Sequence, residues 1–474
     1  MLFNSLPFLI FLPTVFALYW FVFKKYLRVQ NGFVIVASYV FYGWWDYRFL
    51  GLIIVSTLID FCVGFELGRQ KHEVKRRVLL LVSLVCNLGL LGFFKYYNFF
   101  VDTWVDAWHS LGVVMHPATL QIILPVGISF YTFQTLSYTI DIYRKELKPT
   151  KDLVAFAAYV SFFPQLVAGP IERARHLLPQ FTEGRHFVFD FAKSGLHLIL
   201  WGLFKKVVVA DNCAFFVSLI FENPSGFSTL ELLLGAVLFG FQIYGDFSGY
   251  SDMAIGMGRL FGFHLRTNFR FPYFSRNIAE FWRRWHVSLS TWFRDYVYIP
   301  LGGSRVSLYK QVRNVCIVFL VSGFWHGANW TFIVWGGIHA LLFVPLLLFR
   351  NTKKYQESGF ALRQLLPMIG TFLLVTLAWV FFRSNSIEAA LIYLKTLFLF
   401  KAFDLDVFYN TPKYLLFSLI SGFSILIMLC MEFRAFKRQR DALEFSFLGG
   451  LIIALLIMFL GVFKNPSDFI YFQF

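Results

Sequence analysis

Two histidines are the residues in this sequence most able to perform acid–base chemistry. His326 lies in the run GFWHG at 323–327, and His286 lies between Arg283 and Ser290 in a segment rich in aromatic and basic residues. A neutral imidazole can take a proton from a hydroxyl group, because its ordinary pKa lies near neutrality. The sequence therefore offers two candidate catalytic residues. A structural role is the alternative for both, and it is the weaker one for His326.

Further polar and aromatic residues near these histidines could line a substrate passage. Asp246 and Ser248 follow an apolar run, and a helix cap is an equally good interpretation of Asp246. Asp246, Asn329 or His286 could orient the reacting groups. The six candidates for lining the passage are Asp246, Ser248, Trp285, Arg294, Trp325 and Asn329. We find no P-loop, GxSxG, HExxH or paired-cysteine pattern, so we expect neither a metal nor a permanently bound cofactor.

The composition indicates a polytopic membrane protein. Of the 474 residues 58% are hydrophobic and 15% are charged, whereas soluble proteins have about 45–50% and about 25%. This excludes a soluble enzyme, a disordered chain and a disulfide-rich secreted scaffold. The net charge of +16 comes mostly from short segments between apolar runs, so it favours topology signals and contact with anionic headgroups over nucleic-acid binding.

The apolar runs predict an all-α protein with roughly ten to twelve membrane helices, some of them partial. The first run, 6–23, is followed by basic residues, which is the reverse of a secretory signal, so we expect it to be a retained helix. Segments 24–28, 69–77 and 144–151 hold three, five and four basic residues, whereas 101–120 holds none. Because basic loops stay in the cytoplasm, the N-terminus should lie outside.

This frame predicts a position for His326 well inside the membrane. Only twelve residues, 314–325, separate it from Arg313, and a helix of that length rises about 18 Å. The hydrocarbon core is about 30 Å thick, and ionisable residues at such depth are usually functional. Trp325 and Trp330 could wall a pocket around it.

Residues 266–313 look different from a membrane span. They hold nine basic residues against two acidic ones, and aromatic residues recur at helical spacing between 278 and 296. We predict an amphipathic helix on the cytoplasmic side, lying at the interface or dipping into the protein. It could be an anchor, or a basic mouth that attracts the phosphates of coenzyme A or an acidic carrier protein.

These motifs resemble the membrane-bound O-acyltransferase superfamily, in the branch that contains alginate O-acetyltransferase. The resemblance covers nearly the whole chain. The matching stretches are 94–99 (FKYYNF), 124–134 (LPVGISFYTFQ), 163–171 (FPQLVAGPI), 246–252 (DFSGYSD), 281–296 (FWRRWHVSLSTWFRDY) and 323–327 (GFWHG).

The resemblance implies a single integral membrane domain over 1–474, with helices around a central tunnel or funnel and additional C-terminal helices at 364–474. An acyl thioester donor, with acetyl-CoA as the first choice, would approach from the cytoplasm and a hydroxyl acceptor from the other side. The family's essential His matches His326, and its second motif His matches His286. The implied location is the bacterial inner membrane, with a polysaccharide or a partner-protein hydroxyl as acceptor and an extracytoplasmic SGNH-type acetyltransferase as a possible partner.

The resemblance leaves other functions open. A relative transfers D-alanine from a carrier protein towards teichoic acid and shares both His motifs, although the tail beyond residue 380 favours the polysaccharide branch. A transporter, in which Asp246, His286 and His326 would line a permeation path, and a scaffold for polymer-export proteins are the remaining alternatives.

Overall fold

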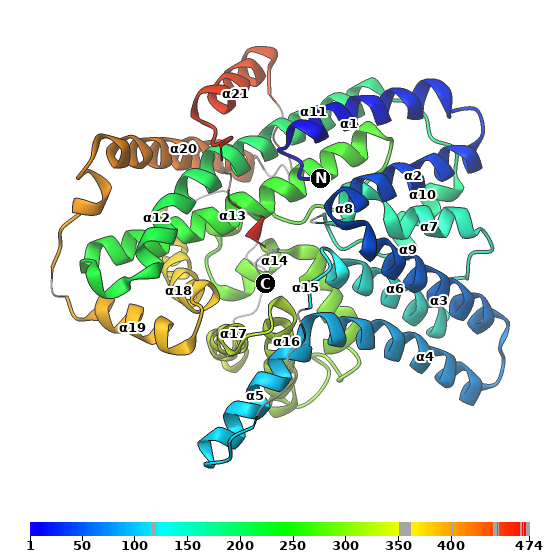
Figure 1. The fold of residues 1–474 in the computed structure, drawn as a ribbon, viewed down its shortest axis with the longest axis horizontal. Helices are drawn as coiled ribbons and strands as arrows, with labels where there is room; N and C mark the ends of the chain where they lie inside the picture. The colour runs from blue at the N-terminus through cyan, green and yellow to red at the C-terminus, as the bar shows by residue number, and fades with distance from the viewer. Residues whose placement is uncertain are drawn as a thin grey trace. The chain divides into compact units, whose positions relative to one another are not determined.

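The computed structural model describes residues 1–474 except 116–119, 121, 168, 350–361, 401, 439–442, 444, 465, 466, 468 and 471–474. Within these described residues the protein is helical and has no strand, which confirms the predicted fold class (Figure 1). The contacts divide the chain into two compact units. Unit 1 comprises Met1–Lys193 and Met257–Leu265, and unit 2 comprises Ser194–Gly256 and Arg266–Phe474.

Unit 1 is a set of apolar helices held together in part by a buried polar cluster. The Asp60 carboxylate accepts hydrogen bonds from Ser83 (2.5 Å), Asn87 (2.8 Å) and Thr139 (3.0 Å), so it joins three helices away from water. The helical segments are α1 (Leu6–Ala17), η1 (Leu18–Val22), α2 (Leu27–Asp46), η2 (Tyr47–Phe49), α3 (Leu50–Arg69), α4 (Glu73–Leu91), η3 (Gly92–Tyr96), α5 (Tyr97–Ser110), α6 (Ile128–Tyr143), α7 (Leu153–Ser161), α8 (Phe163–Leu166), α9 (Ala174–Leu177) and α10 (Pro179–Thr182).

Unit 2 contains all the residues that the sequence nominates for chemistry. Helix α11 (Phe189–Leu203) leads into it, and the long α13 (Thr229–Leu260) carries Asp246 and Ser248. The other segments are η4 (Phe204–Ala210), α12 (Asp211–Glu222), η5 (Pro224–Gly226), η6 (Pro272–Phe274), α14 (Ile278–Arg284), α15 (Val287–Phe293), η7 (Arg294–Tyr298), α16 (Leu308–His326), α17 (Trp330–Leu348), η8 (Leu362–Gln364), α18 (Leu365–Arg383), α19 (Ile387–Phe398), η9 (Asp406–Phe408), α20 (Pro412–Lys437) and α21 (Phe447–Leu460).

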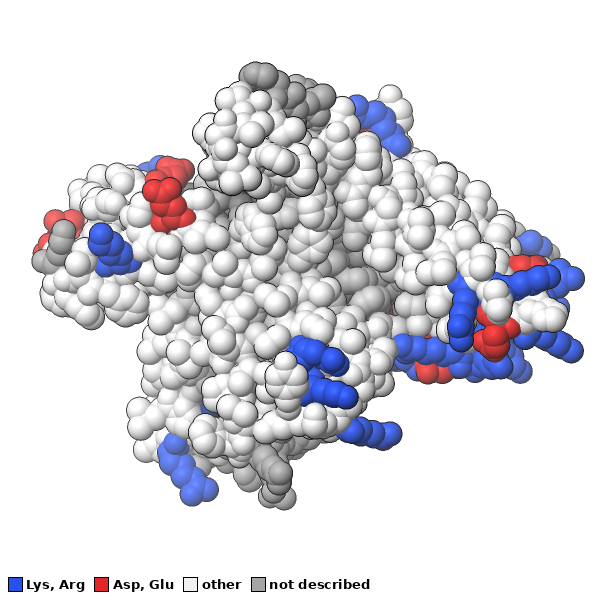
Figure 2. Space-filling view, turned by 90° about the horizontal axis from the view of Figure 1, so that it is seen from below, with Lys and Arg blue, Asp and Glu red and all other residues white. Residues whose placement is uncertain are grey.

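Six helical stretches among the described residues are long and apolar enough to cross a membrane, and two of them contain two helices each. Two shorter apolar helices, Leu6–Val22 and Phe447–Leu460, accompany them. Uncharged residues cover most of the face shown in Figure 2, and Lys, Arg, Asp and Glu gather there in separate clusters. The number of long apolar helices and the small number of charged residues on this face identify an integral membrane protein.

The segment 266–313 differs from the single amphipathic helix that the sequence predicts. The helix breaks at Trp285 and His286, because His286 adopts a left-handed backbone conformation (φ 43°) between α14 and α15. Part of its polar face is also withdrawn from water, whereas Arg283 and Arg294 stay exposed. Glu280 is 4% exposed and is paired with Arg276 (2.7 Å) and Arg284 (3.0 Å). Burial alone would raise the pKa of Glu280, but the hydrogen bonds from Arg276 and the charge of Arg284 outweigh burial and hold that pKa below its ordinary value.

Candidate active site

A tightly packed helical hairpin carries His326. Helices α16 and α17 run side by side, and His326 is the last residue of α16, at the tip of the hairpin. The hairpin can close because Gly323 and Gly336 face each other. A Cβ atom at Gly323 would overlap the backbone of Phe332, and one at Gly336 would overlap the backbone of Phe319. Small residues at a membrane helix interface allow such close approach.

Aromatic rings surround the His326 imidazole, which is 2% exposed. The ring lies edge-to-face with Trp335, with centroids 5.1 Å apart, and 5.5 Å from the Phe382 ring of α18. Trp325 contacts it at 5.0 Å. The other predicted wall residue, Trp330, is 48% exposed, and Trp335 takes the place expected for it. The imidazole is therefore shielded from water, which is a property that a reaction centre inside a membrane protein needs.

Asn268 fixes the orientation of His286, which is fully buried. The Asn268 side-chain oxygen accepts from the backbone N–H of Ser288 (3.3 Å) and from its hydroxyl (2.8 Å), so the atom facing them must be oxygen. His286 Nδ1 lies 3.1 Å from the same oxygen and must therefore donate. The Nε2 atom then carries the lone pair, which is the form of imidazole that can accept a proton. Burial lowers the pKa of His286 to about 3, so the ring is neutral near pH 7.

Trp325 connects the two histidines. Its ring lies 5.0 Å from that of His326 and 6.3 Å from that of His286. Phe247 of α13 packs edge-to-face against His286 at 4.7 Å. The structure therefore brings both predicted catalytic residues next to one tryptophan, although 40 residues separate them in the sequence.

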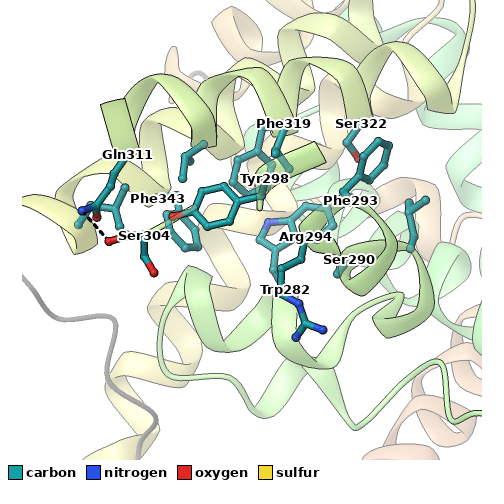
Figure 3. Close-up of a pocket in the computed structure, with 14 residues that line it drawn as sticks. Trp282, Ser290, Phe293, Arg294, Tyr298, Ser304, Gln311, Phe319, Ser322 and Phe343 are labelled. Carbon is teal, nitrogen blue, oxygen red and sulfur yellow. Dashed lines mark hydrogen bonds between the residues drawn. The ribbon is translucent and has the colours of Figure 1, made fainter. Parts of the chain in front are cut away.

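A cavity of about 310 Å³ lies beside α16 (Figure 3). It extends from Gln311 and Ser304 at one end to Ser322 at the other, a rise of about 16 Å along the helix. Ser322 lies one turn before His326 and on the same face of α16, although His326 itself is not among the lining residues. The remaining lining residues are Trp282, Leu289, Ser290, Phe293, Arg294, Tyr298, Val315, Val318, Phe319, Phe343 and Leu347.

Arg294 is the one charged residue among those that line the cavity. It lies in η7, a short π-helical segment, and its side chain is 59% exposed. The guanidinium is paired with the neighbouring Asp295 at 2.6 Å. An exposed pair of this kind contributes little to stability, so Arg294 can exchange its partner for an anionic ligand.

The other predicted lining residues lie outside this cavity. Trp285 is 1% exposed and packs against Phe281, with ring centroids 5.5 Å apart. Asn329 caps α17 by accepting from the backbone N–H of Thr331 (3.0 Å). Ser248 is fully buried in α13.

Asp246 lies in the middle of α13 and not at a helix end. It is paired with Lys206 of η4 at 2.8 Å. Lys206 also contacts Asp211 at 2.9 Å and donates to the carbonyl oxygen of Ser467 (2.9 Å). The backbone N–H of Ile470 donates to the second oxygen of Asp246 (2.7 Å). This ion-pair network therefore holds the C-terminal residues Ser467 and Ile470 in unit 2.

No motif in the sequence identifies Lys206, but one signal was available. Two adjacent lysines, Lys205 and Lys206, interrupt an otherwise apolar run, and charges in such runs are usually paired. Lys205 is paired with Asp252 at 2.7 Å. In the part of the chain that the structure describes, no cluster of three or more His, Cys, Asp or Glu side chains could hold a metal ion.

In the residues that the structure describes, the protein is a helical membrane protein with two buried histidines that both contact Trp325, a site suited to chemistry away from water. The family model for membrane-bound O-acyltransferases matches residues 131–391, and the chain belongs to this family. It is therefore an acyltransferase.

Named relatives place the chain within the family. A protein from Pseudomonas aeruginosa, named probable alginate O-acetylase AlgI, is 42% identical over 86% of this chain and 76% of its own length. A peptidoglycan O-acetyltransferase from Helicobacter pylori is 34% identical over 100% of this chain and 98% of its own. A teichoic acid D-alanyltransferase from Streptococcus thermophilus is 30% identical, but over only 51% of this chain and 63% of its own. These matches confirm the predicted superfamily and branch.

Proposed function

We propose that this protein transfers an acetyl group from a cytoplasmic thioester, acetyl-CoA, to a hydroxyl acceptor for the O-acetylation of an extracytoplasmic polysaccharide. Two of the relatives are named for O-acetylation of such polymers. The observation that carries the proposal is the cavity beside α16, which ends at Ser322, one helical turn from His326.

In this mechanism the cavity holds the acyl donor. The pantetheine arm lies between Trp282, Phe319 and the other apolar lining residues, and Arg294 contacts the phosphates of the donor. His326 takes the proton of the acceptor hydroxyl while the hydroxyl oxygen attacks the thioester carbonyl carbon. The C–S bond then breaks, and the thiolate leaves with the proton that His326 returns. The products are one ester and one thiol.

The chemistry of the lining favours an acetyl donor over a D-alanyl donor. The fourteen residues that line the cavity include no Asp or Glu. The ammonium group of a D-alanyl thioester would meet no anionic lining residue there. Since desolvating an unpaired charge is costly, the cavity fits an uncharged acyl group.

The proposal extends to the setting of the reaction. The basic loops favour an N-terminus outside the bacterial inner membrane, and in this orientation the donor would reach the cavity from the cytoplasm. The acetyl group leaves on the other side, either directly to the polymer or through an SGNH-type acetyltransferase that delivers it.

Transfer of radiolabelled acetyl groups by the purified protein in vesicles tests the function. Wild-type protein should form an alkali-labile acetyl ester on a soluble polysaccharide acceptor, and His326→Ala should lose at least about 10²-fold in rate. The control His72→Ala replaces a histidine outside unit 2 and should retain activity. Equal use of acetyl and D-alanyl thioesters would contradict the donor assignment. Full activity of His326→Ala would remove His326 from the mechanism, and flux of an acetylated solute without covalent transfer would indicate a transporter.

A further inference from the structure

His339 lies between the cavity and the site around His326. It belongs to α17 and is fully buried. Its ring packs edge-to-face against Trp335 at 4.9 Å and against Trp282 at 5.0 Å. Trp335 contacts His326, and Trp282 lines the cavity. The His339 imidazole therefore contacts one residue that lines the cavity and one residue that packs against His326.

A hydrogen bond fixes the relative orientation of His339 and Trp282. The indole N–H of Trp282 donates to Nδ1 of His339 at 3.2 Å. An indole nitrogen can only donate, so Nδ1 must carry the lone pair and the proton of the neutral ring must be on Nε2. The donor of Trp282 is part-buried, and a buried N–H without an acceptor is costly. His339 therefore favours the one orientation of the indole in which this bond forms.

The orientation of the indole matters because its ring forms part of the cavity wall. The Trp282 ring packs against Phe319 with centroids 5.3 Å apart, and both rings line the cavity (Figure 3). Rotation of the indole away from His339 would change the shape of the wall that Trp282 and Phe319 form together. The side chain of Trp282 thus forms a wall whose position depends on a residue outside the cavity.

We infer that His339 is a positioning residue, which shapes the donor cavity by holding the Trp282 indole through its Nδ1 lone pair. This inference rests on the proposed function, because it assigns the cavity to the acyl donor. His339 is absent from the residues that line the cavity, so its effect passes through Trp282. Its loss should therefore change the KM for the donor more than the kcat.

Four variants test the hydrogen bond from both ends. His339→Phe keeps a flat ring but removes the acceptor, and Trp282→Phe removes the donor. Each should raise the donor KM about tenfold and change kcat less than about threefold. His339→Asn should restore a KM near that of the wild type, because its amide oxygen can occupy the position of Nδ1. The double variant His339→Phe/Trp282→Phe should raise the donor KM by the same factor as either single variant, and not by the product of the two factors, because both substitutions remove the same hydrogen bond.

Three results would overturn the inference. The first is an unchanged donor KM in His339→Phe. The second is the same donor KM in His339→Asn and His339→Phe. The third is a donor KM in the double variant that rises by the product of the two single-variant factors. If His339→Phe does not accumulate in the membrane, Trp282→Phe and His339→Asn still decide the question, since the inference requires the first to raise KM and the second not to. An inactive wild-type protein would contradict the proposed function itself.

Discussion

At the scale of single residues, the orientation of the His286 ring depends on one amide. The left-handed backbone at His286 is unusual for a residue with a side chain, and it persists only because the surroundings hold it. Asn268 supplies that support twice. Its backbone oxygen accepts from Val287 N–H (2.8 Å), and its side chain connects His286 Nδ1 with Ser251 (3.0 Å).

Replacing Asn268 should therefore impair the chemistry through His286. In Asn268→Leu, Nδ1 of His286 and the N–H of Ser288 both lose their acceptor, and we expect a loss of about 1–3 kcal/mol in stability together with a fall in kcat. Ser251→Ala is the matched control, because it removes only the bond on the far side of the amide. Thermal unfolding in detergent and the acetyl-transfer rate measure the two effects. Equal kcat in the two variants would show that His286 needs no fixed tautomer.

At the scale of elements, the hairpin of α16 and α17 positions both His326 and the cavity. Three features of the sequence define it: Gly323 and Gly336 at the contact, and Asn329 as the cap that starts α17. The third element of the site, α18, adds Phe382 to the rings around His326. Displacement of α16 against α17 would therefore move the imidazole and the cavity wall together.

An enlarged residue at the hairpin contact should separate these helices. Gly323→Val places three carbon atoms where one Cβ already overlaps the Phe332 backbone, so we expect a destabilisation of about 1–3 kcal/mol or more and loss of acetyl transfer. Gly337→Ala, one residue from the contact glycine of α17, is the control, because its Cβ would meet only Leu320 at an ordinary 3.8 Å. The measurement is the melting temperature of each purified variant, which should be lower for Gly323→Val than for Gly337→Ala. A Gly323→Val protein as stable as Gly337→Ala would show that the hairpin can open without harm.

At the scale of the whole chain, contacts between residues far apart in the sequence stabilise unit 2. Lys206 connects η4 with Asp246 on α13 and with Ser467 near the C-terminus. The ring of Phe469, which is fully buried, packs against Phe247, the residue that contacts His286. Ser467 and Phe469, near the C-terminus, therefore belong to the core that supports the site.

Removal of the Lys206 charge should release the segment that contains Ser467 and Phe469. Lys206→Met leaves Asp246 and Asp211 buried without their cation, and breaking a buried ion pair from one side costs about 3–5 kcal/mol. We expect a lower melting temperature and faster proteolysis after residue 460. Lys395→Met, at an exposed position on α19, should behave as wild type. Unchanged proteolysis in Lys206→Met would mean that the apolar contacts of Phe469 suffice to hold the segment.

Sequence patterns predict this protein well where they are local. The apolar runs give the helical class. The break at His286 is missed because the stripe from 278 to 296 has helical periodicity throughout, and the competing hydrogen bonds come from Asn268, eighteen residues away. The pairing of Asp246 is missed for the same reason, since its partner lies on another helix.

The burial of His326 has a consequence for the hydrolysis of the thioester donor. A thioester is open to hydrolysis wherever an activated water molecule can reach its carbonyl carbon. The His326 imidazole is 2% exposed and is surrounded by the rings of Trp325, Trp335 and Phe382. These rings keep water molecules from the imidazole when no acceptor is bound. Under the proposed function, the donor then persists until an acceptor hydroxyl enters, and idle turnover to free acetate is suppressed.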